Sequence, residues 1–127
     1  MDKVKVSDKL LLSVEKPARY TGGELNSIVK ETARLRFALC FPDVYEIGMS
    51  HLGSRILYEV INSREEYACE RCFAPWPDME KAMRENNVPM FTLETRTPLA
   101  ECDIVGISLL YEMCYTNILT MLDLAHI

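Results

Sequence analysis

The chain has 127 residues, of which 49% are hydrophobic and 26% are charged. This length suffices for one domain with its own core and is too short for two ordinary domains. Its net charge of −5 argues against nucleic acid as a partner, because phosphate binding needs a basic face. No apolar run is long enough for a membrane span or a secretory signal. We therefore expect a cytoplasmic protein whose five cysteines are reduced thiols.

Residues 1–33 are predicted to form an N-terminal arm that leads into the domain. Ser7 or Asp8 can cap a short helix that continues toward Val14. The segment 16–24 contains a proline and a pair of glycines, which exclude a regular helix there.

Residues 34–127 are predicted to form an α/β domain around a mostly parallel sheet. The segments 34–41 and 103–108 are apolar on both faces, so we expect adjacent, parallel strands at the centre of a covered sheet. Residues 67–74 predict another strand. Residues 90–94 alternate in polarity, which is typical of a short edge strand, and we place it beside 67–74.

Three helices are expected between and after these strands. The first starts near Ser50, the second opens around Pro77, and the last runs from Asn117 to Ala125. The apolar positions expected to face the core are Leu52, Ile56, Leu57, Val60 and Ile61 in the first helix, Met79, Ala82 and Met83 in the second, and Ile118, Leu119, Leu122 and Ala125 in the last.

The order of these elements predicts a flavodoxin-like or Rossmann-like fold with right-handed crossovers. Such sheets usually continue to a further strand, whereas this chain stops at Ile127 directly after a helix. We therefore expect a domain that is cut short before its last strand or strands. The strand at 103–108 would then have an unpaired edge, through which the chain would self-associate.

Ligands of open α/β sheets bind past the carboxyl ends of the strands. The first strand is followed by the pattern Asp-x-Tyr-x-x-Gly, and a later strand is followed by Ser-x-Leu. If the two strands are neighbours, the two loops flank one crevice.

The two patterns resemble those of cobalamin-binding domains of the methionine synthase type. Those domains have Asp-x-His-x-x-Gly and Ser-x-Leu at strand ends, and a later Gly-Gly pair that would lie beyond Ile127 here. The resemblance implies that the candidate cofactor-binding residues are Asp43, Tyr45, Gly48, Ser108 and Leu110. Longer runs resemble the N-terminal part of a family that fuses a cobalamin-binding-like domain to a radical-SAM domain. These runs are VEKPARYTGGELNS, FPDVYEIGMSHLG, CFAPWPDMEKAMRENN, LETRTPL and DIVGISLLYEMCYTNILTMLDLA.

The resemblance implies a radical-SAM domain in the same full-length protein, which would bind a [4Fe–4S] cluster and S-adenosylmethionine. The Cys-x-x-x-Cys-x-x-Cys motif for that cluster does not occur in this chain, so we expect a module that is not catalytic by itself. Its implied cofactor is cobalamin, or it keeps a relic of that site. Tyr45 stands where the relatives have a cobalt-ligating His, and a neutral phenol is a weak donor, so we expect cobalt to have no protein nitrogen ligand from this loop.

Two alternatives remain at this point. The domain can be a structural or regulatory flavodoxin-like module with an empty crevice, in which Gly48 only supplies a positive φ angle. It can also be a small redox protein that uses Cys69 and Cys72, although a strand would place these two thiols on opposite faces. A zinc site lacks its second ligand pair, so no metal site is expected. His51 is interpreted as a surface or capping residue near a helix start.

Overall fold

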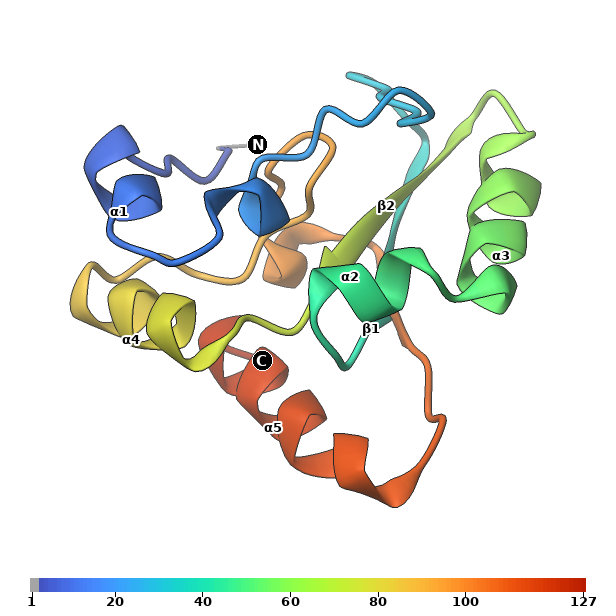
Figure 1. The fold of residues 1–127 in the computed structure, drawn as a ribbon. Coiled ribbons are helices and arrows are strands. Elements are labelled where there is room, and N and C mark those ends of the chain that lie inside the picture. Colours follow the sequence, from blue (N-terminus) through green and yellow to red (C-terminus); the bar gives the residue numbers. More distant parts are fainter. Residues whose placement is uncertain (1–2) are drawn as a thin grey trace.

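The computed structural model describes residues 3–127, which are built around a three-stranded parallel sheet in the order β2-β1-β3 (Figure 1). The middle strand is β1 (Leu35–Phe41), with β2 (Tyr67–Phe73) on one side and β3 (Ile104–Ile107) on the other. β1 pairs in parallel with both neighbours. The α/β, Rossmann-like fold class is confirmed, and so is the parallel pairing of β1 with β3.

The two strands predicted at the sheet centre have different surroundings. β1 is central, and Ala38 and Cys40 are fully buried within it. Among the described strands, β3 pairs with β1 alone, and Ile104 is half-exposed. The prediction that β3 is central is therefore wrong for this sheet. Its apolar sequence reflects packing of Val105 and Ile107 against the core on one face only.

Helices cover the two faces of the sheet unequally. The larger core lies on the face covered by α1 (Asp8–Leu12), α4 (Pro77–Glu85) and α5 (Tyr115–Leu124). The opposite face is covered by α3 (Leu52–Asn62), with a smaller cluster beneath it. As predicted, α4 buries Met79, Ala82 and Met83, and Ala125 directly after α5 is buried. Within α5 the buried residues are Met121 and Leu124, which the sequence did not predict, while the predicted core residue Leu119 is exposed.

The helix ends follow the local sequence signals. Ser7 caps α1, its hydroxyl accepting a hydrogen bond from the Leu10 amide at 3.2 Å. His51 caps α3, its Nδ1 accepting from the Ser54 amide at 3.1 Å, which is the capping role expected for it. A short helix that was not predicted, α2 (Tyr45–Met49), lies within the loop that follows β1.

The orientation of α3 differs from the prediction. Tyr58 and Asn62 face the sheet, whereas Leu52, Ile56 and Val60 are exposed. Hydrogen bonds explain this rotation. The Asn62 amide group bonds both the N–H and the carbonyl of Cys69 at 2.9 and 3.0 Å, and the Tyr58 hydroxyl accepts from the Ile28 amide at 2.8 Å. Polar side chains that meet buried backbone groups thus outweigh the apolar stripe in setting the inward face.

Residues 90–94 do not form the predicted edge strand. They belong to a buried turn that is closed by one isolated antiparallel bridge, between Phe91 and Pro98. The turn lies beside β2, the expected side, where the Leu93 amide donates to the Arg71 carbonyl at 2.9 Å. The Glu94 carboxylate accepts from the Arg71 amide at 2.7 Å. The Glu94 side chain therefore accepts the hydrogen bond of an amide at the edge of β2, for which a neighbouring strand would otherwise supply the acceptor.

The N-terminal arm packs into the larger core. After α1 it forms a 3-10 turn, Pro17–Tyr20, and Gly22 and Gly23 follow with φ of 64° and 78°. The backbone there approaches Leu93 so closely that a Cβ on Gly22 would lie 2.7 Å from the Leu93 carbonyl oxygen. Two more 3-10 turns, Leu99–Glu101 and Glu112–Cys114, precede β3 and α5. The core residues contributed by the arm are Val4, Val6, Leu10 and Val14.

Candidate functional site

The loops that follow β1 and β3 meet at the carboxyl edge of the sheet. The Ser108 amide donates to the Cys40 carbonyl at 3.1 Å, which carries the strand pairing one step past β3. Beyond it, the Tyr111 hydroxyl donates to Asp43 Oδ2 at 3.3 Å. Asp43 and the loop that starts at Ser108 therefore lie together, as the sequence predicts. We call residues 42–44 and 108–111 the strand-end loops.

The strand-end loops carry an exposed apolar rim. Leu109, Leu110, Tyr111 and the neighbouring Met113 are all exposed, although a solvated loop does not need such side chains. Hydrogen bonds with Cys114 and the charge of Asp43 raise the pKa of Tyr111 to about 12, so its phenol is neutral at ordinary pH. The site thus offers a carboxylate, hydroxyl groups and apolar surface.

Tyr45 is not directed at the Ser108 loop. It lies on α2, its hydroxyl donates to Glu24 Oε1 at 2.6 Å, and its ring packs edge-on against Phe73 with centroids 5.5 Å apart. Burial, followed by the nearby Glu24 carboxylate, raises the pKa of Tyr45 to about 12. This candidate residue therefore joins the arm to β2.

Gly48 is required for close packing and has no positive φ angle. It lies inside α2, where a Cβ would overlap the Phe73 ring and would lie 3.3 Å from Phe41. The expectation that Gly48 shapes a turn is therefore wrong. No local sequence signal indicates this role, because Phe73 is distant in the chain and reaches Gly48 only through the parallel register of β1 and β2.

Beside Gly48 lies a cavity of about 530 Å³, between α3, the end of α2 and the strands β1 and β2. The sequence does not indicate this cavity, because the apolar stripe of α3 that lines it is typical of a helix face packed on the core. We call it the α3 cavity. Its lining includes Glu24, Leu25, Asn26, Leu39, Phe41, Gly48, Met49, Leu52, Arg55, Ile56, Tyr58, Glu59, Val60, Arg71 and Phe73.

Arg71 is the buried charge of the α3 cavity. Its Nε donates to Glu94 at 2.5 Å and its Nη2 to Glu24 at 2.8 Å, while the guanidinium lies over the Tyr58 ring, 5.0 Å from the centroid. Burial alone would raise the pKa of Glu24, but hydrogen bonds from Tyr45, Ser27 and Arg71 outweigh it and lower this pKa to about 2. The guanidinium is thus held in one orientation by two carboxylates.

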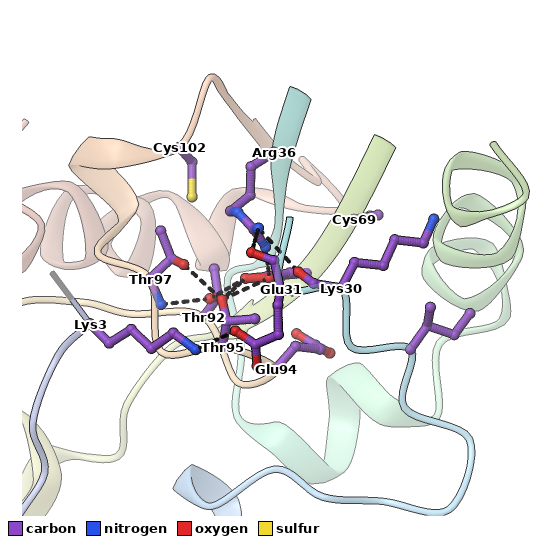
Figure 2. A network of polar contacts seen from close by, with 12 residues as sticks. Lys3, Lys30, Glu31, Arg36, Cys69, Thr92, Glu94, Thr95, Thr97 and Cys102 are labelled. Carbon is purple, nitrogen blue, oxygen red and sulfur yellow. Dashed lines mark hydrogen bonds and ion pairs between the residues drawn. The ribbon is translucent and has the colours of Figure 1, made fainter. Parts of the chain in front are cut away.

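A second buried network lies on the other face of β2. Arg36 of β1 pairs with Glu70, and the hydroxyls of Thr92 and Thr95 donate to the same carboxylate at 2.7 and 2.6 Å. Figure 2 shows the threonines, together with Thr97, converging from the turn that follows Phe91. Each member has a partner, and Glu70 is fully buried. This network anchors the turn to the sheet and offers no open site.

Cys69 and Cys72 both lie in the strand β2. Cys69 packs with Leu39 under α3, and Cys72 packs in the larger core on the opposite face, which confirms the predicted separation. Burial raises the pKa of Cys69 to about 12, and a hydrogen bond with Cys40, followed by burial, raises that of Cys72. Neither thiol is activated toward redox chemistry. Within residues 3–127, no group of three or more His, Cys, Asp or Glu could hold a metal ion.

Two comparisons gave no relatives: no curated protein and no solved structure matches the chain. In residues 3–127, no helix has both the length and the apolar character needed to cross a bilayer. Residues 53–127 match the family model described as radical SAM proteins, N-terminal. The matched stretch contains α3 from its second residue onward, β2, α4, β3 and α5, together with the Ser108 loop, and begins after Gly48. Because the match covers more than half of the chain, this protein belongs to the family of N-terminal regions of radical-SAM proteins.

Proposed function

We propose that this chain is a non-catalytic module of a radical-SAM protein that receives a corrinoid, cobalamin, at the strand-end loops. The contact between Tyr111 and Asp43 carries the proposal, since it joins the two loops that bear the Asp-x-Tyr-x-x-Gly and Ser-x-Leu patterns. The iron–sulfur cluster and S-adenosylmethionine would belong to a radical-SAM domain of the same protein. The cytoplasmic location expected from the sequence stays a prediction.

The residues of the strand-end loops fit the edge of a corrinoid. Such a ring has apolar faces and a rim of amide groups, and the loops pair exposed Leu109 and Leu110 with the polar Asp43 and Ser108. A bound corrinoid supplies a cobalt centre for methyl transfer or one-electron chemistry. This chain would orient the ring and exclude water from one face. Tyr45 would give cobalt no ligand, because its hydroxyl is engaged by Glu24.

A structural module without a cofactor is the second candidate. Two contacts favour it: the Phe73 ring fills the space next to Gly48, and Tyr45 is bonded to the arm. In a cofactor site, both positions would be expected to face the ligand. In this candidate, Asp43 and Ser108 serve only to close the loops at the edge of the sheet.

Retention of hydroxocobalamin separates the two candidates. The protein is mixed with the corrinoid and desalted, and the proposal predicts that the visible spectrum stays with the protein. Leu110→Glu should abolish retention, because it puts a charge on the apolar rim. Leu57→Glu is the matched control, since Leu57 is 47% exposed on α3 and Leu110 is 45% exposed. Absence of retention, or an equal loss in both variants, would favour the cofactor-free module.

The state of cobalt gives a second test. The proposal predicts that paramagnetic resonance of the Co(II) form shows no nitrogen splitting from this protein. Tyr45→Phe should leave the spectrum unchanged, since its hydroxyl already donates to Glu24. Nitrogen splitting that is traced to His51 would overturn this account of the site.

A further inference from the structure

The α3 cavity has the size and lining of a small-molecule site. Its volume of about 530 Å³ lies within the range of roughly 300–1,000 Å³ that ligand pockets occupy. Buried Leu39 and Phe41 form part of its lining, and Ile56 and Val60 of α3 form another part while remaining more than half exposed. A helix whose apolar stripe faces a cavity instead of the sheet leaves that stripe available to a ligand.

One donor at the wall of this cavity lacks a strong acceptor. Arg71 is anchored through Nε and Nη2 by carboxylates, whereas its Nη1, within the described part of the chain, donates to the Met49 sulfur at 3.1 Å. A thioether is a weak acceptor. Arg71 and Met49 both line the cavity, so this edge of the guanidinium is within reach of a ligand atom.

The charges around Arg71 select against anions. The guanidinium carries one positive charge, whereas Glu24 and Glu94, both bonded to it, carry up to two negative ones. A carboxylate or phosphate on the ligand would meet an already neutralised cation beside spare negative charge. A neutral oxygen or ring nitrogen can accept from Nη1 without that repulsion.

We propose that the α3 cavity binds a neutral, mainly apolar ring compound that carries one hydrogen-bond acceptor for Arg71 Nη1. The aromatic side chains Phe41, Tyr58 and Phe73 in the lining suit a flat ring system. This site is separate from the strand-end loops, because Asp43, Ser108 and Leu110 are not among its lining residues.

Three fluorescent naphthalenes test the ligand class on the intact chain. Prodan is neutral and has a carbonyl acceptor, N-phenylnaphthylamine is neutral without one, and anilinonaphthalene sulfonate is anionic. We expect saturable binding of one prodan per chain, with affinity about tenfold above that of N-phenylnaphthylamine, as one hydrogen bond to a charged donor allows. The sulfonate should bind more weakly than both. Non-saturable binding of prodan, or tighter binding of the sulfonate, would overturn the proposal.

A pair of neighbouring variants places the bound probe. Ile56 lines the cavity and is 53% exposed, whereas Leu57 does not line it and is 47% exposed, so we expect a charge at either position to leave the fold intact. Ile56→Glu should weaken prodan binding by at least about tenfold, and Leu57→Glu should leave it unchanged. Equal effects would place the probe elsewhere. Displacement of prodan by hydroxocobalamin would show that the cavity belongs to the strand-end site, and the separate site would be wrong.

Discussion

Gly48 and Phe73 form a contact that leaves no room for a side chain. Alanine is the better helix former by about 1 kcal/mol, so Gly48→Ala would stabilise an isolated α2. Here the added methyl meets the Phe73 ring, and overpacking of this kind costs about 1–3 kcal/mol. We expect Gly48→Ala to lower the free energy of unfolding in urea by up to about 2 kcal/mol.

A smaller side chain at position 73 provides the control for this prediction. Adding Phe73→Leu to Gly48→Ala should recover part of the lost stability, because the smaller side chain vacates the space at the helix. A Gly48→Ala variant as stable as the original chain would mean that the Phe73 ring moves aside at no cost, contrary to the packing argument.

Glu24 makes stability depend on pH in the acid range. Its pKa is lowered to about 2 in the folded chain, against an ordinary value of 4.5, so the ionised carboxylate favours the folded state. This contribution is complete above the unfolded pKa of 4.5 and is lost as the pH falls toward about 2. Glu24→Gln should therefore be less stable than the original chain above pH 4.5, and the difference should shrink below it.

Urea unfolding at a series of pH values measures this effect. The exposed Glu65→Gln serves as the control, since Glu65 lies outside the network around Arg71. A difference between Glu24→Gln and the original chain that stays constant from pH 6 to about 2 would contradict the assignment of the stabilisation to the ionised form.

At the scale of elements, local sequence patterns predicted the positions of β1, β2 and α4 closely. Contacts between residues far apart in the chain determined the features that these patterns did not predict. The Arg34–Phe41 run is apolar on both faces, so a central strand followed directly. The inward face of α3 depends on bonds from Asn62 to Cys69, and the path of residues 90–94 depends on Glu94 meeting the Arg71 amide. The spacing of apolar residues along the chain does not indicate which distant residues form hydrogen bonds with one another, so the α3 cavity could not be predicted.

At the candidate site, the sequence pattern predicted that the strand-end loops meet, and long-range contacts determined where their side chains lie. Their meeting followed from placing Asp43 and Ser108 at the ends of two neighbouring parallel strands. The placement of Tyr45 did not, because its partner Glu24 lies in the arm, for which the sequence predicts no fixed contact. Motif position therefore located the loops, and tertiary contacts determined which side chains they present.

The Arg36–Glu70 pair ties the turn after Phe91 to the sheet, and removing one partner should be costly. Arg36→Met leaves a fully buried carboxylate without its cation, which typically costs about 3–5 kcal/mol. We expect a loss of that size in urea unfolding. The double variant Arg36→Met with Glu70→Leu should be more stable than Arg36→Met alone, since no buried charge remains. A double variant less stable than the single one would contradict the argument.

At the scale of the whole molecule, the sheet has one open side. β2 is covered along its outer edge by the turn that contains Leu93 and Glu94, whereas β3 has β1 as its partner and no second strand among residues 3–127. Exposed apolar side chains flank that open edge, with Ile104 on the strand and Leu109 two residues after its end. Unpaired backbone groups beside apolar surface recruit other chains.

We therefore expect the chain to self-associate through β3, with an average mass in sedimentation velocity that rises with concentration. Ile104→Lys should shift the protein toward monomer, because a lysine at a sheet edge must be desolvated when another strand pairs there. Leu12→Lys is the control, since Leu12 is exposed on α1 at the opposite end of the sequence. If the original chain is monomeric at all concentrations, or if both lysines have equal effects, association is not directed by this edge. A specific effect of Ile104→Lys would instead identify β3 as the surface where a neighbouring strand is accepted.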